Sequence, residues 1–145
     1  PLEQEIELLR LYIDFEQLQR PGKFEYTLEV DLAVNVHNTM IPPMIIQPFV
    51  ENAVKHGLLY KAGPGKLDIR FSQTGDTLLC TISDDGVGRE AAAAIQERSH
   101  KLYKSHGTRL VRERVDILNE MGHHIDIQTE DRPGGGTTVL IQFTD

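Results

Sequence analysis

One short stretch of this chain, residues 51–57, gathers side chains that could handle a metal-bound phosphate. It reads Glu51-Asn52-Ala53-Val54-Lys55-His56-Gly57. Asn52, Lys55 and His56 fall at positions i, i+3 and i+4, so they share one face of a helix. An amide oxygen suits Mg²⁺, and the two basic side chains suit phosphate oxygens. The apolar residues fall on the opposite arc and predict a buried side: Ile46, Phe49, Val50, Ala53 and Val54.

A second segment, Asp84-Asp85-Gly86-Val87-Gly88, directly follows a strand-like run. A carboxylate at a strand end can accept a hydrogen bond from an exocyclic amine such as that of adenine. Gly86 and Gly88 lack side chains, which would let a flat ring approach the backbone. An ordinary turn would have the same composition, so the segment alone leaves both interpretations open.

Two further segments carry glycine next to threonine. Ser105-His106-Gly107-Thr108 precedes a helix, whose first N–H groups and positive dipole end suit phosphate. Arg109, Arg112 and Arg114 follow within two turns, although a capped helix with solvated arginines would look the same. The run Gly134-Gly135-Gly136-Thr137 precedes the last strand, where glycines allow close passage of a ligand or simply form a loose hairpin loop.

These residues must be positioned by a domain of ordinary composition. The chain has 145 residues, 39% of them hydrophobic, which is enough for one domain with a real core. Its net charge of −7 argues against a nucleic-acid surface. No apolar run reaches the roughly 20 residues of a membrane span. The single cysteine, Cys80, excludes an internal disulfide and reads as a core residue.

Periodicity predicts the elements. Helices are expected over 2–20, from Pro42-Pro43 to Gly57 with a kink or restart at Pro48, over 89–98 and over 108–120. Strands are expected over 24–30, 66–72, 77–83, 124–130 and 137–143. Helices alternate with hairpin-linked strands, so we expect an α/β (α+β) two-layer sandwich. Its sheet should be mixed and mostly antiparallel, with helices on one face and water on the other.

The order of the four segments resembles the Bergerat ATP-binding fold, shared by gyrase-type topoisomerases, chaperone ATPases, MutL proteins and histidine kinases. Within that superfamily the chain is similar to the catalytic domain of LytS-like sensor histidine kinases. The run from Pro42 to Gly57 carries most of the resemblance, which extends over Leu2–Ile6 and Val111–Val115. The resemblance implies that residues 1–20 lead in from an upstream dimerisation and phosphoacceptor region. Residues 21–145 would then form the catalytic domain.

The resemblance also implies roles for single residues toward ATP and Mg²⁺. Asn52 would coordinate the metal, and Glu51 would hold a metal-bound water or polarise the reacting centre. Lys55 would contact phosphate, and His56 would either touch phosphate or cap the helix end. The remaining residues would surround the base and the phosphates: Asp84, Gly86, Gly88 and Thr137 at the adenine, and Gly107 with Thr108 over the phosphates. Many relatives have a second glycine where Ser105 stands here, which bears on closure over the nucleotide.

The phosphate acceptor of such kinases is a histidine beside Pro and Phe in an upstream helix. None of the six histidines has that setting, so we expect the acceptor to lie outside this chain. The adjacent His123 and His124 lack a third ligand at suitable spacing, which disfavours a metal site. The implied partners are ATP, the upstream acceptor domain of a homodimeric parent and a response regulator. We expect a cytoplasmic domain whose parent is anchored in the cytoplasmic membrane.

Two other functions remain open at this point. The domain could be a nucleotide-gated interaction module without turnover, an idea that Ser105 motivates. It could also be a protein serine kinase like the anti-sigma-factor branch of the superfamily. The paired prolines and the long first helix favour the sensor-kinase branch.

Overall fold

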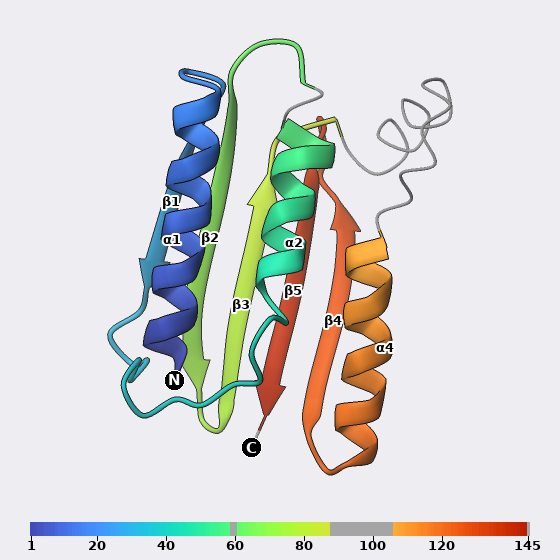
Figure 1. Ribbon diagram of the computed structural model, residues 1–145. Helices are drawn as coiled ribbons and strands as arrows, with labels where there is room; N and C mark the ends of the chain where they lie inside the picture. The colour runs from blue at the N-terminus through green and yellow to red at the C-terminus, as the bar shows by residue number, and fades with distance from the viewer. Residues whose placement is uncertain (59–60, 88–105, 145) are drawn as a thin grey trace.

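The computed structural model of the chain describes residues 1–58, 61–87 and 106–144. Within these ranges the strands are β1 (Phe24–Val30), β2 (Gly65–Thr74), β3 (Thr77–Asp84), β4 (His124–Asp131) and β5 (Thr137–Thr144). They form one sheet in the order β1-β2-β3-β5-β4 (Figure 1). Only the β1–β2 pair is parallel, and the other three pairs are antiparallel. The predicted mixed, mostly antiparallel sheet is confirmed.

The helices cover one face of this sheet (Figure 1). They are α1 (Leu2–Gln19), α2 (Gln47–Asn52) and α4 (His106–Glu120), and α2 continues as a π-helical segment, η1 (Ala53–Leu58). Along β2, buried residues alternate with more exposed ones, as expected for a sheet that packs against helices on one face and meets water on the other. The predicted two-layer arrangement is therefore confirmed. The helix expected over 89–98 lies outside the described residues.

The core lies between the two layers. Leu9 and Ile13 of α1, Val50 of α2 and Phe71 of β2 are fully buried in it. The arc predicted to be buried on residues 46–54 is buried throughout. Helix α1 thus shares its core with the sheet. Cys80 is also fully buried, as expected of a core residue. No helix in the described part of the chain is long and apolar enough to cross a membrane.

The start of the central helix differs from the prediction. Helix α2 begins at Gln47, not at Pro42, and Pro48 sits in its first turn. Pro43 disfavours helical backbone at Pro42, and Met44 takes a left-handed conformation with φ of 61°. Both effects keep the Pro42–Ile46 segment out of the helix. Pro48 starts the helix because its missing N–H is not needed in the first turn.

The strand register defines two ends of the sheet. Asp84 on β3 is paired with Thr137 on β5 at one end, and Leu78 is paired with Phe143 near the other. Helix α4 begins and η1 ends toward the Asp84 end (Figure 1). Parts of all four segments that the sequence singled out therefore lie toward the same end of the molecule.

Candidate functional site

Backbone segments from three motifs meet around Asp84, in a cluster that we call the Asp84 junction: Gly57, Asp84, Asp85, Gly86 and Gly136. A Cβ on Gly86 would lie 2.2 Å from the carbonyl carbon of Gly57, and one on Gly136 would lie 1.9 Å from the carbonyl oxygen of Asp84. The N–H of Val87 donates to the carbonyl of Gly57 over 3.2 Å. Glycine is thus required at Gly86 and Gly136, because the backbone of another segment occupies the space that a Cβ would need.

Gly86 has a packing role that the sequence did not indicate. The sequence suggested that Gly86 makes room for a flat ring. In the structure the direction of its absent Cβ is filled by the backbone of Gly57. Gly86 therefore brings the end of η1 against the end of β3, and only its backbone is left to face a ligand.

Asp84 is a buried carboxyl group in this junction, with 4% of its surface exposed. Its Oδ1 accepts a hydrogen bond from the N–H of Gly86 at 2.9 Å. Burial raises its pKa to about 6, against the lowering effects of the Gly86 hydrogen bond and the charge of Arg132. A buried carboxyl of this kind can accept a hydrogen bond from a ligand amine with little competition from water.

The neighbouring Asp85 has a different role. Its Oδ1 accepts from the N–H of Lys66 at 2.7 Å, and its Oδ2 pairs with the Lys61 ammonium at 3.3 Å. These partners lower the pKa of Asp85, although burial opposes them. Asp85 therefore ties the strand end to β2, whereas Asp84 points into the junction.

A cavity of 240 Å³ adjoins this junction, and we call it the Asn52 cavity. Three residues predicted from sequence line it together: Asn52 from α2, Thr108 from the first turn of α4 and Thr137 from the start of β5. Thr137 is also the strand partner of Asp84, so it joins the cavity to the Asp84 junction. The other lining residues are Phe49, Arg112, Thr129 and Val139.

Arg112 supplies positive charge to this cavity, and sequence reasoning did not separate it from its neighbours. Its guanidinium lies 5.8 Å from the centre of the Phe49 ring and donates to the Thr129 hydroxyl at 2.9 Å. Arg109 instead pairs with Glu113, and Arg114 donates to the carbonyl of Pro43. The spacing could have indicated Arg112, because it lies four residues after Thr108 and shares its helix face.

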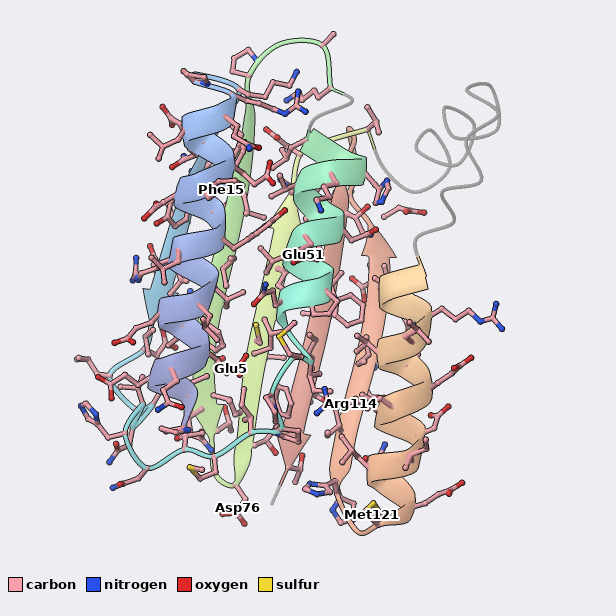
Figure 2. The ribbon with its side chains drawn as sticks, in the orientation of Figure 1. Glu5, Phe15, Glu51, Asp76, Arg114 and Met121 are labelled. Carbon is pink, nitrogen blue, oxygen red and sulfur yellow. The ribbon has the colours of Figure 1, made fainter. Side chains whose placement is uncertain are left out.

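The other side chains predicted within residues 51–57 are not among those that line the cavity. Glu51 is half-buried on α2 (Figure 2), and its Oε1 accepts from Gln47 Nε2 at 3.1 Å. Lys55 is exposed and His56 is half-buried. Burial and the Lys55 charge lower the pKa of His56, which favours its neutral form. Residues 53–58 are π-helical, with i→i+5 bonding, so α-helical spacing alone no longer places Lys55 and His56 on the face of Asn52.

Three further positions complete the comparison with the sequence. Gly107 lies in the first turn of α4, next to Thr108. Gly88 and Ser105 lie outside the described residues. His123 and His124 are exposed, and no group of three or more His, Cys, Asp or Glu in the described ranges could hold a metal ion.

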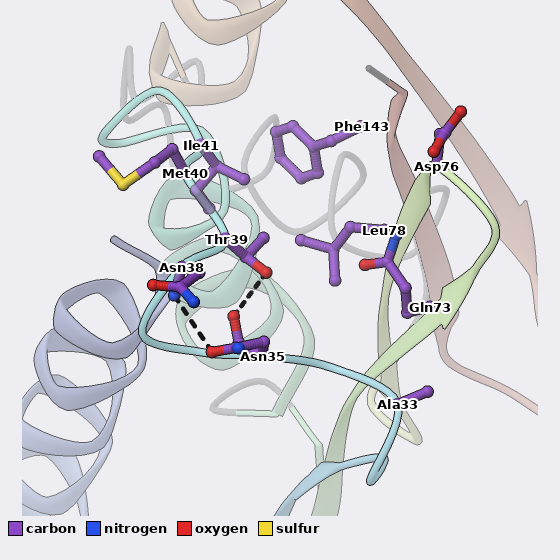
Figure 3. A pocket seen from close by; sticks show the side chains of 10 residues that line it. All are labelled: Ala33, Asn35, Asn38, Thr39, Met40, Ile41, Gln73, Asp76, Leu78 and Phe143. Carbon is purple, nitrogen blue, oxygen red and sulfur yellow. Dashed lines mark hydrogen bonds between the residues drawn. The ribbon is translucent and has the colours of Figure 1, made fainter.

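A larger cavity of 380 Å³ lies toward the opposite end of the sheet (Figure 3). Several of the polar groups in its lining make local hydrogen bonds. The backbone N–H of Asn38 donates to Asn35 Oδ1 at 3.2 Å, and the Thr39 hydroxyl donates to the carbonyl of Asn35 at 2.6 Å. The amide of Gln73 donates to the carbonyl of Gly75. Among the described residues, neither a cationic side chain nor a helix start lines this cavity.

A family model described as "histidine kinase-, DNA gyrase B-, and HSP90-like ATPase" matches residues 42–145. Among curated proteins, the sensor protein LytS of Oceanobacillus iheyensis is 32% identical over 90 residues, which are 62% of this chain and 15% of that protein. The sensor histidine kinase/phosphatase LytS of Staphylococcus aureus is 25% identical over 139 residues, which are 94% and 24% of the two chains. The chain thus spans less than a quarter of the length of these relatives.

Solved structures give the same fold. The catalytic domain of histidine kinase ThkA superposes with a TM-score of 0.61 at 19% identity, covering 95% of this chain and 92% of that one. The blue-light activated histidine kinase EL346 of Erythrobacter litoralis has a TM-score of 0.60 at 22% identity, covering 99% and 42%. At such identities the likeness concerns the architecture alone.

Proposed function

Since this chain belongs to the family of histidine kinase-, DNA gyrase B- and HSP90-like ATPases, we propose that it is the catalytic domain of a two-component sensor histidine kinase. In that role it binds ATP and presents the γ-phosphate to a histidine of an upstream domain. From that histidine the phosphate passes to an aspartate of a response regulator. The observation that carries the proposal is the meeting of Asn52, Thr108 and Thr137 around one cavity that adjoins buried Asp84.

The adenine end of the nucleotide is assigned to the Asp84 junction. Asp84 accepts a hydrogen bond from the exocyclic amine, and the backbones of Gly86 and Gly88 line the ring. Thr137 lies beside Asp84 in the register and also lines the cavity, so it stands between base and phosphates. The burial of Asp84 supports this assignment, because a buried hydrogen bond discriminates strongly between amine and carbonyl.

The phosphate end is assigned to the Asn52 cavity. The N–H groups of the first turn of α4, at Gly107 and Thr108, and the guanidinium of Arg112 provide donors for phosphate oxygens. Lys55 and His56 follow Asn52 along the chain, in η1, and would contact the terminal phosphate. A protein of net charge −7 needs such local positive groups to hold a polyanion.

Mg²⁺ fits the residues that are present. The described ranges hold no carboxylate cluster for a metal, while the side chain of Asn52 lines the cavity. Mg²⁺ commonly takes one or two protein ligands and completes its shell with phosphate oxygens and water. When bound, the ion would neutralise charge on the phosphates. Asn52 is its proposed ligand, and Glu51, held by Gln47, would orient a water or polarise the reacting centre.

The test is transfer to a separately made acceptor domain from the parent protein. With γ-labelled ATP, we expect acid-labile phosphate on the acceptor, and Glu51→Gln should bind ATP but lose transfer. Binding of ATP without any transfer would contradict the kinase proposal and favour a nucleotide-gated interaction module. Acid-stable phosphate would instead favour the serine-kinase branch.

The remaining partners follow from the same proposal. The parent would be a homodimer anchored in the cytoplasmic membrane, with this domain on the cytoplasmic side, where ATP and a response regulator are present. Co-purification of the parent with membranes, and cross-linking of its subunits there, would test this placement. A parent that stays in the soluble fraction would contradict it.

A further inference from the structure

One side of α1 carries three polar residues that are withdrawn from water. Glu5, Tyr12 and Glu16 are spaced seven and four residues apart, so they lie along the same side of the helix. Glu5 and Glu16 are each only 7% exposed, and the hydroxyl oxygen of Tyr12 is buried. Buried polar groups are normally hydrogen-bonded, yet this hydroxyl has no partner among the described residues. The exception requires an explanation.

This side of α1 is turned toward α2. The two helices lie side by side in the helical layer (Figure 1). Burial raises the pKa of Tyr12, and the negative charges of Glu16 and of Glu51 on α2 raise it further. A carboxylate of α2 is therefore close enough to act on a hydroxyl of α1. Because its pKa is raised, the hydroxyl keeps its proton near neutral pH and remains a hydrogen-bond donor.

Glu51 is held from one side only in the structure. Its Oε1 accepts from Gln47 Nε2 at 3.1 Å, one turn earlier on α2. A carboxylate has two oxygens and can accept from a second donor. Consecutive residues of a helix point about 100° apart, so Glu51 can face α1 while Asn52 lines the cavity that α2 forms with α4. Gln47 and Tyr12 can thus fix the carboxylate between them.

We propose that Tyr12 is a positioning residue for phosphoryl transfer, whose hydroxyl donates a hydrogen bond to Glu51 when Mg²⁺ and ATP are bound. The inference rests on the proposed function, in which Glu51 orients a water or polarises the reacting centre. Held by both Gln47 and Tyr12, the carboxylate keeps one orientation, and phosphoryl transfer depends strongly on such positioning. Tyr12 acts through Glu51 and does not contact the nucleotide.

Glu51 suits this hydroxyl better than Glu16 does. Glu16 lies one turn after Tyr12 on the same helix and is buried, so the two residues move as one body, and the hydroxyl makes no hydrogen bond to Glu16. Glu51 is on another helix, is only half-buried and precedes Asn52, the proposed Mg²⁺ ligand. Rotation of its side chain can bring it to Tyr12. The new bond satisfies a hydroxyl that is otherwise buried without a partner, which favours it energetically.

The test is transfer to the separately made acceptor domain, measured over a range of ATP concentrations. Tyr12→Phe should lower the maximal rate roughly tenfold, the effect of one hydrogen bond to a charged group, and leave the KM for ATP within about twofold of wild type. Tyr26→Phe is the matched control, because the Tyr26 hydroxyl donates to Asp14 Oδ1 at 3.2 Å at an exposed position of α1. This variant should leave the maximal rate and the KM unchanged.

Other results would overturn the inference. A wild-type maximal rate in Tyr12→Phe would show that the hydroxyl has no part in transfer, and a lower unfolding temperature would show a structural role. An equal loss of rate in Glu16→Gln, which keeps the shape of the side chain, would assign the hydroxyl to Glu16. Failure of the proposed function is distinguishable, because the wild-type chain itself would then bind ATP without transferring phosphate.

Discussion

The Asp84 junction and the Asn52 cavity adjoin at Thr137, but backbone forms the junction and side chains form the cavity. In the junction, backbone touches backbone, and glycine is required by contacts shorter than a Cβ allows. In the cavity, side chains from α2, α4, β4 and β5 surround open space. The proposed adenine end is thus formed by backbone contacts that the fold requires, whereas the proposed phosphate end is formed by side chains that the fold presents. Substitutions in the junction should damage stability, and those in the cavity should damage binding.

The largest effect is expected at Gly136 in the junction. Gly136→Ala should lower the free energy of unfolding by at least about 3 kcal/mol, because its Cβ would overlap the Asp84 carbonyl and its φ is 97°. Gly122→Ala is the matched control, since Gly122 also has positive φ (101°) but has open space around it. Urea unfolding of both variants measures the difference. Equal losses would mean that contact in the junction contributes nothing beyond backbone strain.

Asp84 should make stability depend on pH. Burial raises its pKa from 3.8 to about 6, so the folded domain holds the proton more tightly than the unfolded chain. The resulting stabilisation is complete below about pH 4 and is lost as the pH rises through about 6. Asp84→Asn cannot ionise, so its stability relative to wild type should rise by roughly 2–3 kcal/mol across this window. A difference that is flat with pH would contradict the raised pKa.

A smaller effect is expected from Arg112 in the cavity. Arg112→Ala should weaken ATP binding roughly tenfold, the loss of one charge-assisted contact, with little change in unfolding. Arg109→Ala is the control, because Arg109 pairs with Glu113 and does not line the cavity. Calorimetric titration of both proteins separates them. Equal weakening would show that only the general positive charge of α4 matters.

The smallest effect is expected at Tyr12, outside both regions. Its hydroxyl oxygen is buried and has no hydrogen-bond partner among the described residues, and burial together with Glu16 and Glu51 raises its pKa. Tyr12→Phe removes an unsatisfied polar atom and should leave stability unchanged or raise it by about 1 kcal/mol. Thermal unfolding gives this baseline. A clear loss of stability would indicate a partner for the hydroxyl in solution.

The periodic elements could be predicted from the sequence, because a helix or strand that buries one face carries apolar residues at a regular spacing. Strand Phe24–Val30 and helix Leu2–Gln19 lie where their alternation placed them. The predicted start of α2 was wrong, because paired prolines are typical of a helix start and the left-handed conformation of Met44 cannot be predicted from its residue type. The π-helical turn over Ala53–Leu58 is also invisible in one-dimensional spacing.

The candidate site was only partly predictable for a related reason. Asn52 and Asp84 were identified by residue type and Thr137 through the family resemblance, and the strand register pairs Asp84 with Thr137. Residue type did not separate Arg112 from Arg109, and only its spacing from Thr108 could have done so; its contacts with Phe49 and Thr129 come from other parts of the chain. The contact between Gly86 and Gly57 is likewise a property of packing, not of composition.

The central claim is that the junction and the cavity hold two ends of one nucleotide. Calorimetry of ATP and adenosine, each with Mg²⁺, tests it with two variants. Asp84→Asn should weaken both ligands, and should spare GTP more than ATP because guanine has a carbonyl in place of the amine. Asn52→Ala should weaken ATP roughly 10- to 100-fold and leave adenosine unchanged. Wild-type ATP affinity in Asp84→Asn, or equal loss of adenosine and ATP in Asn52→Ala, would contradict the claim.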